Sequence, residues 1–186
     1  MRLYLVRHPQ PEVAPGICYG STDLAVAPQE NERAAVALVR ALPKGLPVFS
    51  SPAKRCSGLA ARLAAMLGSP AVTYDARLTE IHFGAWEMRA WDDIPRAEID
   101  AWSKNLIAYR PGGGESVMQM AQRVHAFHED IRRQSEHGAA GGVVCHAGTI
   151  RLLLACQRGL TLAELALHAA QARHQIAYGE MIVIDC

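Results

Sequence analysis

Short apolar runs alternate along this chain with longer segments whose apolar residues recur with a helical period. The short runs are typical of strands and lie at residues 3–6, 47–50, 71–74, 142–145 and 181–184. The periodic segments predict helices over residues 29–42, 54–67, 117–131 and 148–157. Strands that alternate with helices indicate an α/β three-layer sandwich, with a mostly parallel sheet and helices on both faces.

Local signals set several of these helix boundaries. Pro43 and Gly45 end the first helix, and Gly68 ends the second. The pattern Ser116-x-x-Gln119 fits a capping box at the start of the third. The residues expected on the buried face of that helix are Val117, Met120, Ala121, Val124, Phe127 and Ile131.

One stretch lacks a clear period. Residues 88–109 are mixed and contain two tryptophans, which favours short helices over one side of the molecule. The run PGGGE (residues 111–115) looks like a phosphate-binding loop, but it follows no strand and lacks a Lys-Ser/Thr ending. We interpret it as a flexible approach to the capped helix. The expectation is a single domain over residues 1–186, with residues 80–115 forming a cap.

Three of the predicted strands are followed by residues suited to binding an anion. Arg7 and His8 follow the first strand, Arg55 follows the second, and His146 precedes a helix that opens at Gly148. The carboxyl ends of parallel strands meet at one edge of a sheet, where ligands bind. Helix N-termini and arginine forks both favour phosphate oxygens. The sequence therefore predicts a site for a tetrahedral dianion.

Two histidines at such a site allow chemistry as well as binding. A neutral imidazole could attack phosphorus and carry the phosphoryl group covalently. The second histidine, protonated, could stabilise charge on the equatorial oxygens beside the arginines.

Composition narrows the class of protein. The 186 residues include 19 Lys plus Arg and 18 Asp plus Glu, which gives a net charge of +1. The chain therefore lacks the excess of positive charge that is typical of proteins that bind nucleic acid or a membrane surface. No stretch is long enough to span a bilayer. The five cysteines are scattered and contain no C-x-x-C pair, which argues against a disulfide framework and against a zinc site. Such cysteine usage is typical of a protein in the reducing cytoplasm. The oligomeric state is not indicated.

Four spaced motifs carry a resemblance to a known family. They are VRHPQP (residues 6–11), SSPAKRC (50–56), LTEIHFGAWE (78–87) and VVCHAG (143–148). Together they resemble the histidine phosphatase superfamily, also called the phosphoglycerate mutase-like family. The resemblance implies a phosphoglycerate mutase-like fold and catalysis without metal or cofactor. It implies His8 as the nucleophile, Arg7, Arg55 and His146 as phosphate ligands, and Glu80 as the proton donor.

Within that family the chain looks most like the α-ribazole phosphatases, which remove the 5′-phosphate of α-ribazole phosphate in cobalamin assembly. The likeness rests on R-H-P at residues 7–9, CYGSTDL at 18–24 and FGAWEMRAWDDI at 83–94, where Met88 replaces a usual glycine. The alternatives are a broad-specificity phosphatase for small phosphate esters, a mutase-type isomerase, and a phosphate-binding module without activity. A mutase commonly needs a longer chain, and a module would be expected to lack His8 or Glu80.

The chain departs from the family pattern at three positions. Pro9 replaces a glycine and has no N–H, Ala14 stands where an asparagine is common, and Leu59 stands where a threonine is common. Other residues must then supply the outer substrate contacts. The candidates are Gln10, Tyr19, Gly20, Ser21, Thr22 and Ala147.

The choice of proton donor is between two carboxylates of one motif. Spacing favours Glu80 over Glu87, and the alternative for either is a solvated surface group. A carboxylic acid that stays protonated near neutrality needs partial burial, which Ile81, Phe83 and Trp86 could provide.

Several other residues can be interpreted either as structural or as functional. Adjacent strand residues face opposite sides, so Cys145 is interpreted as a core residue and not as a thiol nucleophile. His125, His128 and Glu129 have metal-ligand spacing, but a helix surface is favoured. His168 and His174 either lie near the site mouth or face water. Buried packing is the default for Trp86, Trp91 and Trp102, with stacking on a base as the alternative.

Overall fold

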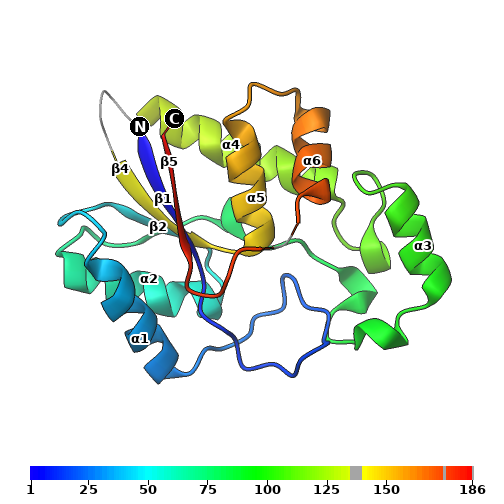
Figure 1. The fold of residues 1–186 in the computed structure, drawn as a ribbon, viewed down its shortest axis with the longest axis horizontal. Coiled ribbons are helices and arrows are strands. Elements are labelled where there is room, and N and C mark those ends of the chain that lie inside the picture. Colours follow the sequence, from blue (N-terminus) through cyan, green and yellow to red (C-terminus); the bar gives the residue numbers. More distant parts are fainter. Residues whose placement is uncertain (135–139, 174, 186) are drawn as a thin grey trace.

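A five-stranded sheet forms the centre of the molecule (Figure 1). The computed structural model describes residues 1–134, 140–173 and 175–185. The strands lie in the order β3-β2-β4-β1-β5. Their bounds are β1 (Arg2–Arg7), β2 (Val48–Ser50), β3 (Thr73–Tyr74), β4 (Ala140–Cys145) and β5 (Met181–Asp185).

The sheet is mostly parallel, as the sequence predicts. The pairs β1–β4, β2–β4 and β2–β3 are parallel, whereas β5 runs antiparallel to β1 at the edge. In the central pair, Val6 lies opposite Val144 and Arg7 opposite Cys145. The carboxyl ends of β1, β2 and β4 therefore meet at one edge of the sheet.

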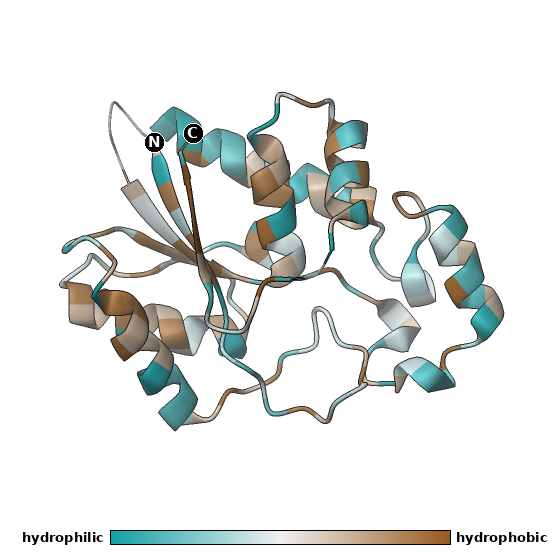
Figure 2. Ribbon diagram, viewed as in Figure 1, coloured by the Kyte–Doolittle hydropathy of each residue, from teal (hydrophilic) through white to brown (hydrophobic). Residues whose placement is uncertain are grey.

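Helices cover both faces of the sheet, which confirms the three-layer α/β sandwich (Figure 1). One face carries α1 (Pro28–Val39) and α2 (Lys54–Leu67). The other carries α4 (Val117–Gln134) and α5 (Ala147–Cys156), with α6 (Leu162–Gln171) packed against both. Figure 2 shows hydrophobic residues along the central strands and on helix surfaces that face them.

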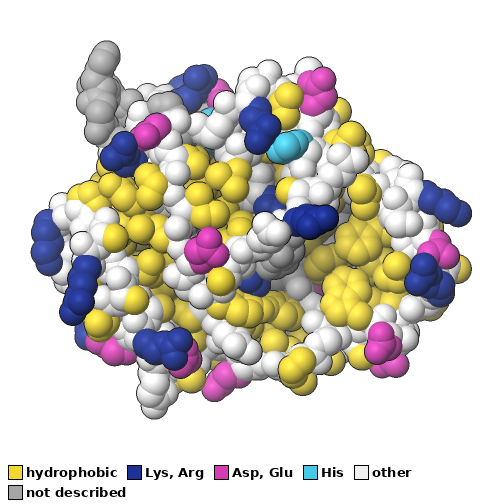
Figure 3. All heavy atoms as spheres, in the orientation of Figure 1, with side chains coloured by type: hydrophobic (Ala, Val, Ile, Leu, Met, Phe, Trp, Pro, Cys, Tyr) yellow, Lys and Arg dark blue, Asp and Glu magenta, His cyan; other side chains and the backbone are white. Residues whose placement is uncertain are grey.

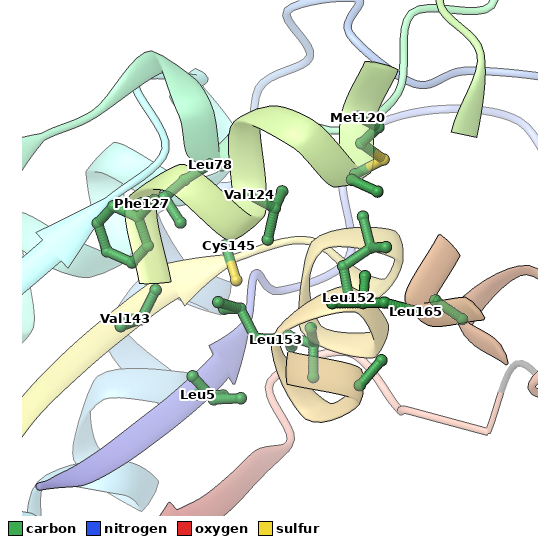
Figure 4. Close-up of a cluster of buried hydrophobic side chains, with 14 of the residues drawn as sticks. Leu5, Leu78, Met120, Val124, Phe127, Val143, Cys145, Leu152, Leu153 and Leu165 are labelled. Carbon is green, nitrogen blue, oxygen red and sulfur yellow. The ribbon is translucent and has the colours of Figure 1, made fainter. Parts of the chain in front are cut away.

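Side-chain alternation along the strands creates a separate core on each face. Leu5 and Val143 pack in the cluster under α4 and α5, and Val6 and Val144 pack in the cluster under α1 and α2. Figure 4 shows Leu5, Val143 and Cys145 facing side chains of α4, α5 and α6. Cys145 is fully buried there, so the interpretation of Cys145 as a core residue is confirmed.

The predicted start of α4 is also confirmed. The Ser116 hydroxyl accepts from the Gln119 backbone N–H at 3.2 Å, and the Gln119 side chain accepts from the Ser116 N–H at 2.9 Å. Five of the six residues expected on its inner face are buried, and Val117 packs against the same cluster as a partly buried residue.

Several boundaries differ from the sequence prediction. Helix α1 ends at Val39 and not at residue 42, because the chain turns there with the Ala41 N–H bonded to the Leu38 carbonyl. Helix α6 was not predicted, although Thr161 and Glu164 form a complete capping box at its start. Strand β3 is shorter than predicted and covers Thr73–Tyr74.

The segment between β3 and α4 consists of short helices. They are η1 (Ala76–Leu78), η2 (Gly84–Trp86), η3 (Trp91–Asp93), α3 (Arg96–Lys104) and η4 (Pro111–Gly113). The prediction for PGGGE as a flexible approach was wrong. Gly112 has φ +56°, and a Cβ there would overlap the Phe83 carbonyl oxygen, so η4 packs directly on η2.

Among the described residues, no helix is both long enough and apolar enough to cross a membrane.

Candidate active site

Three neighbouring strand ends bring the predicted phosphate-binding residues together. The His8 N–H bonds to the Cys145 carbonyl at 3.0 Å, and the Ser51 N–H bonds to the Val144 carbonyl at 3.0 Å. Arg7, His8, Arg55, His146 and Glu80 all line one pocket with a volume of about 280 Å³. These residues are far apart in the sequence, and the strand order is what brings them together.

His8 is held as a neutral imidazole. Its Nδ1 lies 2.7 Å from the Pro9 carbonyl oxygen, which can only accept, so Nδ1 carries the proton and Nε2 keeps its lone pair. The side chain is 2% exposed. Burial, followed by the charges of Arg55 and Arg7, lowers the pKa of His8 to about 3. A neutral Nε2 is the form of histidine that can act as a nucleophile.

His146 is neutral as well, which corrects the interpretation of a protonated second histidine. Arg55 Nε donates to His146 Nδ1 at 3.2 Å, and Ser51 Oγ lies 2.9 Å from His146 Nε2. Because Nδ1 accepts, Nε2 is the protonated nitrogen and donates to Ser51. Burial and the Arg55 charge lower the pKa of His146 well below its ordinary value.

Arg55 lies in the first turn of α2 and has no exposed surface. Its Nη1 donates to the Thr22 carbonyl at 2.5 Å, and its Nη2 donates to the Gly20 carbonyl. With Nε on His146, the guanidinium is fixed on three sides. The loop at residues 20–22 therefore determines where this charge lies.

Glu87 in turn fixes that loop. Its carboxylate accepts from the backbone N–H groups of Gly20, Ser21 and Thr22 and from the Thr22 hydroxyl. It also accepts from the Phe83 N–H at 2.9 Å. Burial would raise the pKa of Glu87, but these hydrogen bonds outweigh it and the pKa is lowered. Glu87 does not line the pocket, so it positions Arg55 through the loop.

Glu80 lies between η1 and η2 and lines the pocket. Its Oε1 accepts from the Ile81 N–H at 3.0 Å, and its Oε2 accepts from the Gly148 N–H at 2.9 Å. Ile81 lines the pocket beside it. Trp86 does not: it is fully buried in a separate cluster and donates to Glu98 at 2.6 Å.

Arg7 is held by a residue that the sequence motifs did not indicate. Its guanidinium carbon lies 3.8 Å from the centre of the Tyr178 ring, and its Nη1 donates to the Ile176 carbonyl at 2.6 Å. The Tyr178 hydroxyl is 2.6 Å from the Tyr19 hydroxyl, so the two rings close one side of the pocket. Tyr178 follows no strand motif, and no local sequence signal could have found it.

The six candidate substrate contacts fall into three groups. Tyr19 and Ala147 line the pocket. Gly20, Ser21 and Thr22 are engaged with Glu87 and Arg55 in the loop described above. Gln10 is exposed and lines a different hollow, on the other side of Tyr178.

The remaining candidates lie away from the pocket. Leu59 is fully buried in the core, and Ala14 is exposed on a loop. His128 is buried, with Nδ1 3.4 Å from Glu129 and Nε2 3.3 Å from Gln157. His168 is exposed on α6, and His174 lies outside the described residues.

Comparison with known proteins assigns the class. Residues 3–178 match the model of the histidine phosphatase superfamily (branch 1), and the chain belongs to that family. It is a phosphatase of the phosphoric monoester hydrolase type, and this family acts on small phosphate esters.

The solved structures that are similar over nearly the whole chain include two phosphatases. The α-ribazole phosphatase from Shigella flexneri is 25% identical with a TM-score of 0.81, covering 100% of this chain and 90% of that one. A mycobacterial glucosyl-3-phosphoglycerate phosphatase is 25% identical with a TM-score of 0.78, covering 99% and 89%. A comparison with curated proteins finds no match.

Proposed function

We propose that this phosphatase works through a phosphohistidine on His8, and that its physiological substrate is α-ribazole 5′-phosphate. The observation that supports a phosphohistidine is the protonation state of His8. It is a neutral imidazole with a free Nε2, in a pocket that also contains two guanidinium groups.

The proposed reaction has two displacements at phosphorus. The lone pair on His8 Nε2 forms an N–P bond while the P–O bond to the leaving group breaks. Glu80 gives its proton to the leaving oxygen, which departs as the alcohol. Water then attacks phosphorus, Glu80 takes the proton from that water, and the N–P bond breaks to release phosphate.

Arg7 and Arg55 stabilise the phosphoryl oxygens in both steps. His146 assists as a neutral group: a rotation that aims its Nε2–H from Ser51 toward phosphate would supply a further donor. The role of the arginines explains why both are anchored by several contacts before substrate arrives, since a prepositioned charge needs no reorganisation during the reaction.

The substrate is proposed from sequence motifs and from structural neighbours. R-H-P, CYGSTDL and FGAWEMRAWDDI resemble α-ribazole phosphatases, and the similar structures include proteins named as such enzymes. A broad-specificity phosphatase is the alternative, because a glucosyl-3-phosphoglycerate phosphatase is similar to the same degree. A mutase-type isomerase is less favoured, because these similar structures are phosphatases.

Residues 80–115 are proposed to act as the cap over the leaving group. Phe83 and Trp91 from this segment line the phosphate pocket, and Trp102 and Leu106 line the space beside it. We also propose that the enzyme works in the cytoplasm, because its five cysteines are scattered along the sequence and contain no C-x-x-C pair.

The test is to trap the phosphoenzyme. Wild-type protein given labelled α-ribazole 5′-phosphate should form an acid-labile, base-stable adduct that His8→Ala lacks. Cys145→Ala is the matched control and should keep both adduct and turnover, because its thiol is in the core. Turnover should survive EDTA and be inhibited by vanadate. An adduct in His8→Ala would place the nucleophile elsewhere, with His146 the next candidate.

A further inference from the structure

A second cavity, about 210 Å³ in volume, adjoins the phosphate pocket. Its walls come from the helices α4, α5 and α6 and from the cap segment, and most of the lining surface is apolar. The residues that line this apolar cavity alone are Trp102, Leu106, Val117, Met120, Leu152, Ala169 and Ala170. Glu80, Ile81, Phe83, Gly148 and Arg151 line both spaces, so the two lie side by side.

The shape of this cavity follows from residue size. Trp102 of α3 forms one wall and stacks on Trp91 with 6° between the ring planes. Ala169 and Ala170 of α6 form part of the lining, and their small side chains leave the space open. On the face drawn in Figure 3, hydrophobic side chains gather beside a hollow near the centre. An apolar cavity of about 150 Å³ is enough to hold benzene, so this one has room for a larger ring system.

We propose that the apolar cavity binds a planar aromatic group at the far end of the leaving alcohol. This proposal rests on the function proposed above, because it uses Glu80 as the proton donor. The leaving oxygen must lie within hydrogen-bond reach of that carboxyl group. Glu80 lies at the junction of the two spaces, so the part of the substrate beyond the oxygen is directed into the apolar cavity.

Arg151 indicates what joins the phosphate to the ring. Its Nη1 donates to the Ala172 carbonyl at 3.0 Å, which anchors the guanidinium at the border of both spaces. A guanidinium at this border favours a polar connecting group, such as a sugar with hydroxyls, over an alkyl chain. The substrate class is therefore an aromatic glycoside phosphorylated on its sugar.

The test compares pairs of substrates that differ only in the ring. Ribose 5-phosphate is α-ribazole 5′-phosphate without its base, and ethyl phosphate is 2-(naphthalen-2-yl)ethyl phosphate without its rings. The wild-type enzyme should prefer the aromatic member of each pair in kcat/KM by about 10-fold to 100-fold, the range for a filled apolar pocket.

Two variants fill the cavity from different elements. Ala170→Phe from α6 and Leu106→Trp from the cap should each bring the aromatic preference down to about 1. Leu167→Phe is the matched control: Leu167 is 40% exposed on α6 and does not line the cavity. It should keep the preference.

The outcomes separate this proposal from the proposed substrate. If α-ribazole 5′-phosphate is not hydrolysed but the naphthyl ester is preferred and Ala170→Phe removes that preference, the cavity assignment stands and the substrate assignment fails. If both filling variants fold and slow the two members of a pair equally, or neither member, the aromatic group binds elsewhere and the proposal is overturned.

Discussion

Arg55 Nε donates a hydrogen bond of 3.2 Å to His146 Nδ1. A proton on Nδ1 would break this bond and place a second positive charge against the guanidinium. The pairing therefore keeps His146 neutral before an anion arrives, together with burial. Burial, followed by the charges of Arg55 and Arg7, lowers the pKa of His8 to about 3.

These two histidines make stability fall in acid. Their pKa values are lower in the folded state than in the unfolded chain, where histidine titrates near pH 6.5. The contribution of these two histidines to the free energy of unfolding is thus fully present above about pH 6.5. It is lost as the pH falls toward 3, because the unfolded chain then binds more protons than the folded one. Because of His8 alone, the free energy of unfolding should fall by about 2–3 kcal/mol between pH 6 and pH 4. Urea unfolding at a series of pH values measures this loss.

The control for this loss is His8→Gln, which cannot take up a proton. Carboxylates that titrate in the same range are common to both proteins, so the difference between the two curves isolates His8. Parallel curves for wild type and His8→Gln would mean that His8 is not held neutral by the fold.

Glu87 should matter for binding without taking part in proton transfer. Glutamine at position 87 keeps one acceptor oxygen but turns an NH₂ group toward backbone donors of the loop at residues 20–22. We expect Glu87→Gln to lower the free energy of unfolding by about 1–3 kcal/mol, the cost of leaving buried donors unpaired. KM should rise by about 10-fold on alkyl and aryl phosphates alike, since about 1.4 kcal/mol of lost phosphate binding corresponds to that factor. Steady-state kinetics on both substrates would reject this role if only the alkyl ester were affected.

Met88 has a backbone conformation that disfavours a side chain. It has φ +64° and is 48% exposed, and its N–H bonds to the Cys18 carbonyl at 2.8 Å. Glycine adopts this conformation without steric cost, although it loses more entropy on folding. Met88→Gly should therefore raise the free energy of unfolding by about 0.5–1 kcal/mol, measured by urea unfolding. Ala14→Gly, at an exposed residue outside the positive-φ region, should have the opposite effect; stabilisation by both would refute the explanation.

The sequence predicted the placement of Arg7, His8, Arg55 and His146 because strand ends and motif spacing determine it. It could not predict the protonation of His146, which depends on a contact with Arg55 across 91 residues. Tyr178 contacts Arg7 from a loop whose sequence has no distinctive pattern. Gln10 is expected from the sequence to supply an outer substrate contact, but it is exposed and lines a different hollow.

The last prediction concerns Glu80 and its contact with Gly148. A general acid matters most when the leaving oxygen is a poor leaving group. Glu80→Gln should thus slow hydrolysis of a sugar phosphate by about 100-fold to 10,000-fold, and that of p-nitrophenyl phosphate far less.

A second variant disturbs the same group without altering its chemistry. A Cβ at Gly148 would overlap Glu80 Oε1, so Gly148→Ala must displace the carboxyl group. Position 148 lies in the first turn of α5, where alanine favours the helix, so the fold should be kept. Gly148→Ala should show the same selective loss on the sugar phosphate.

Combining the two variants makes the test decisive. If both act through proton transfer, Glu80→Gln with Gly148→Ala should be no slower than Glu80→Gln alone, because the second change displaces a group that no longer donates a proton. Additive losses would mean that Gly148→Ala damages the pocket in some other way. An equal loss on both substrates for Glu80→Gln would mean that Glu80 shapes the pocket and protonates nothing.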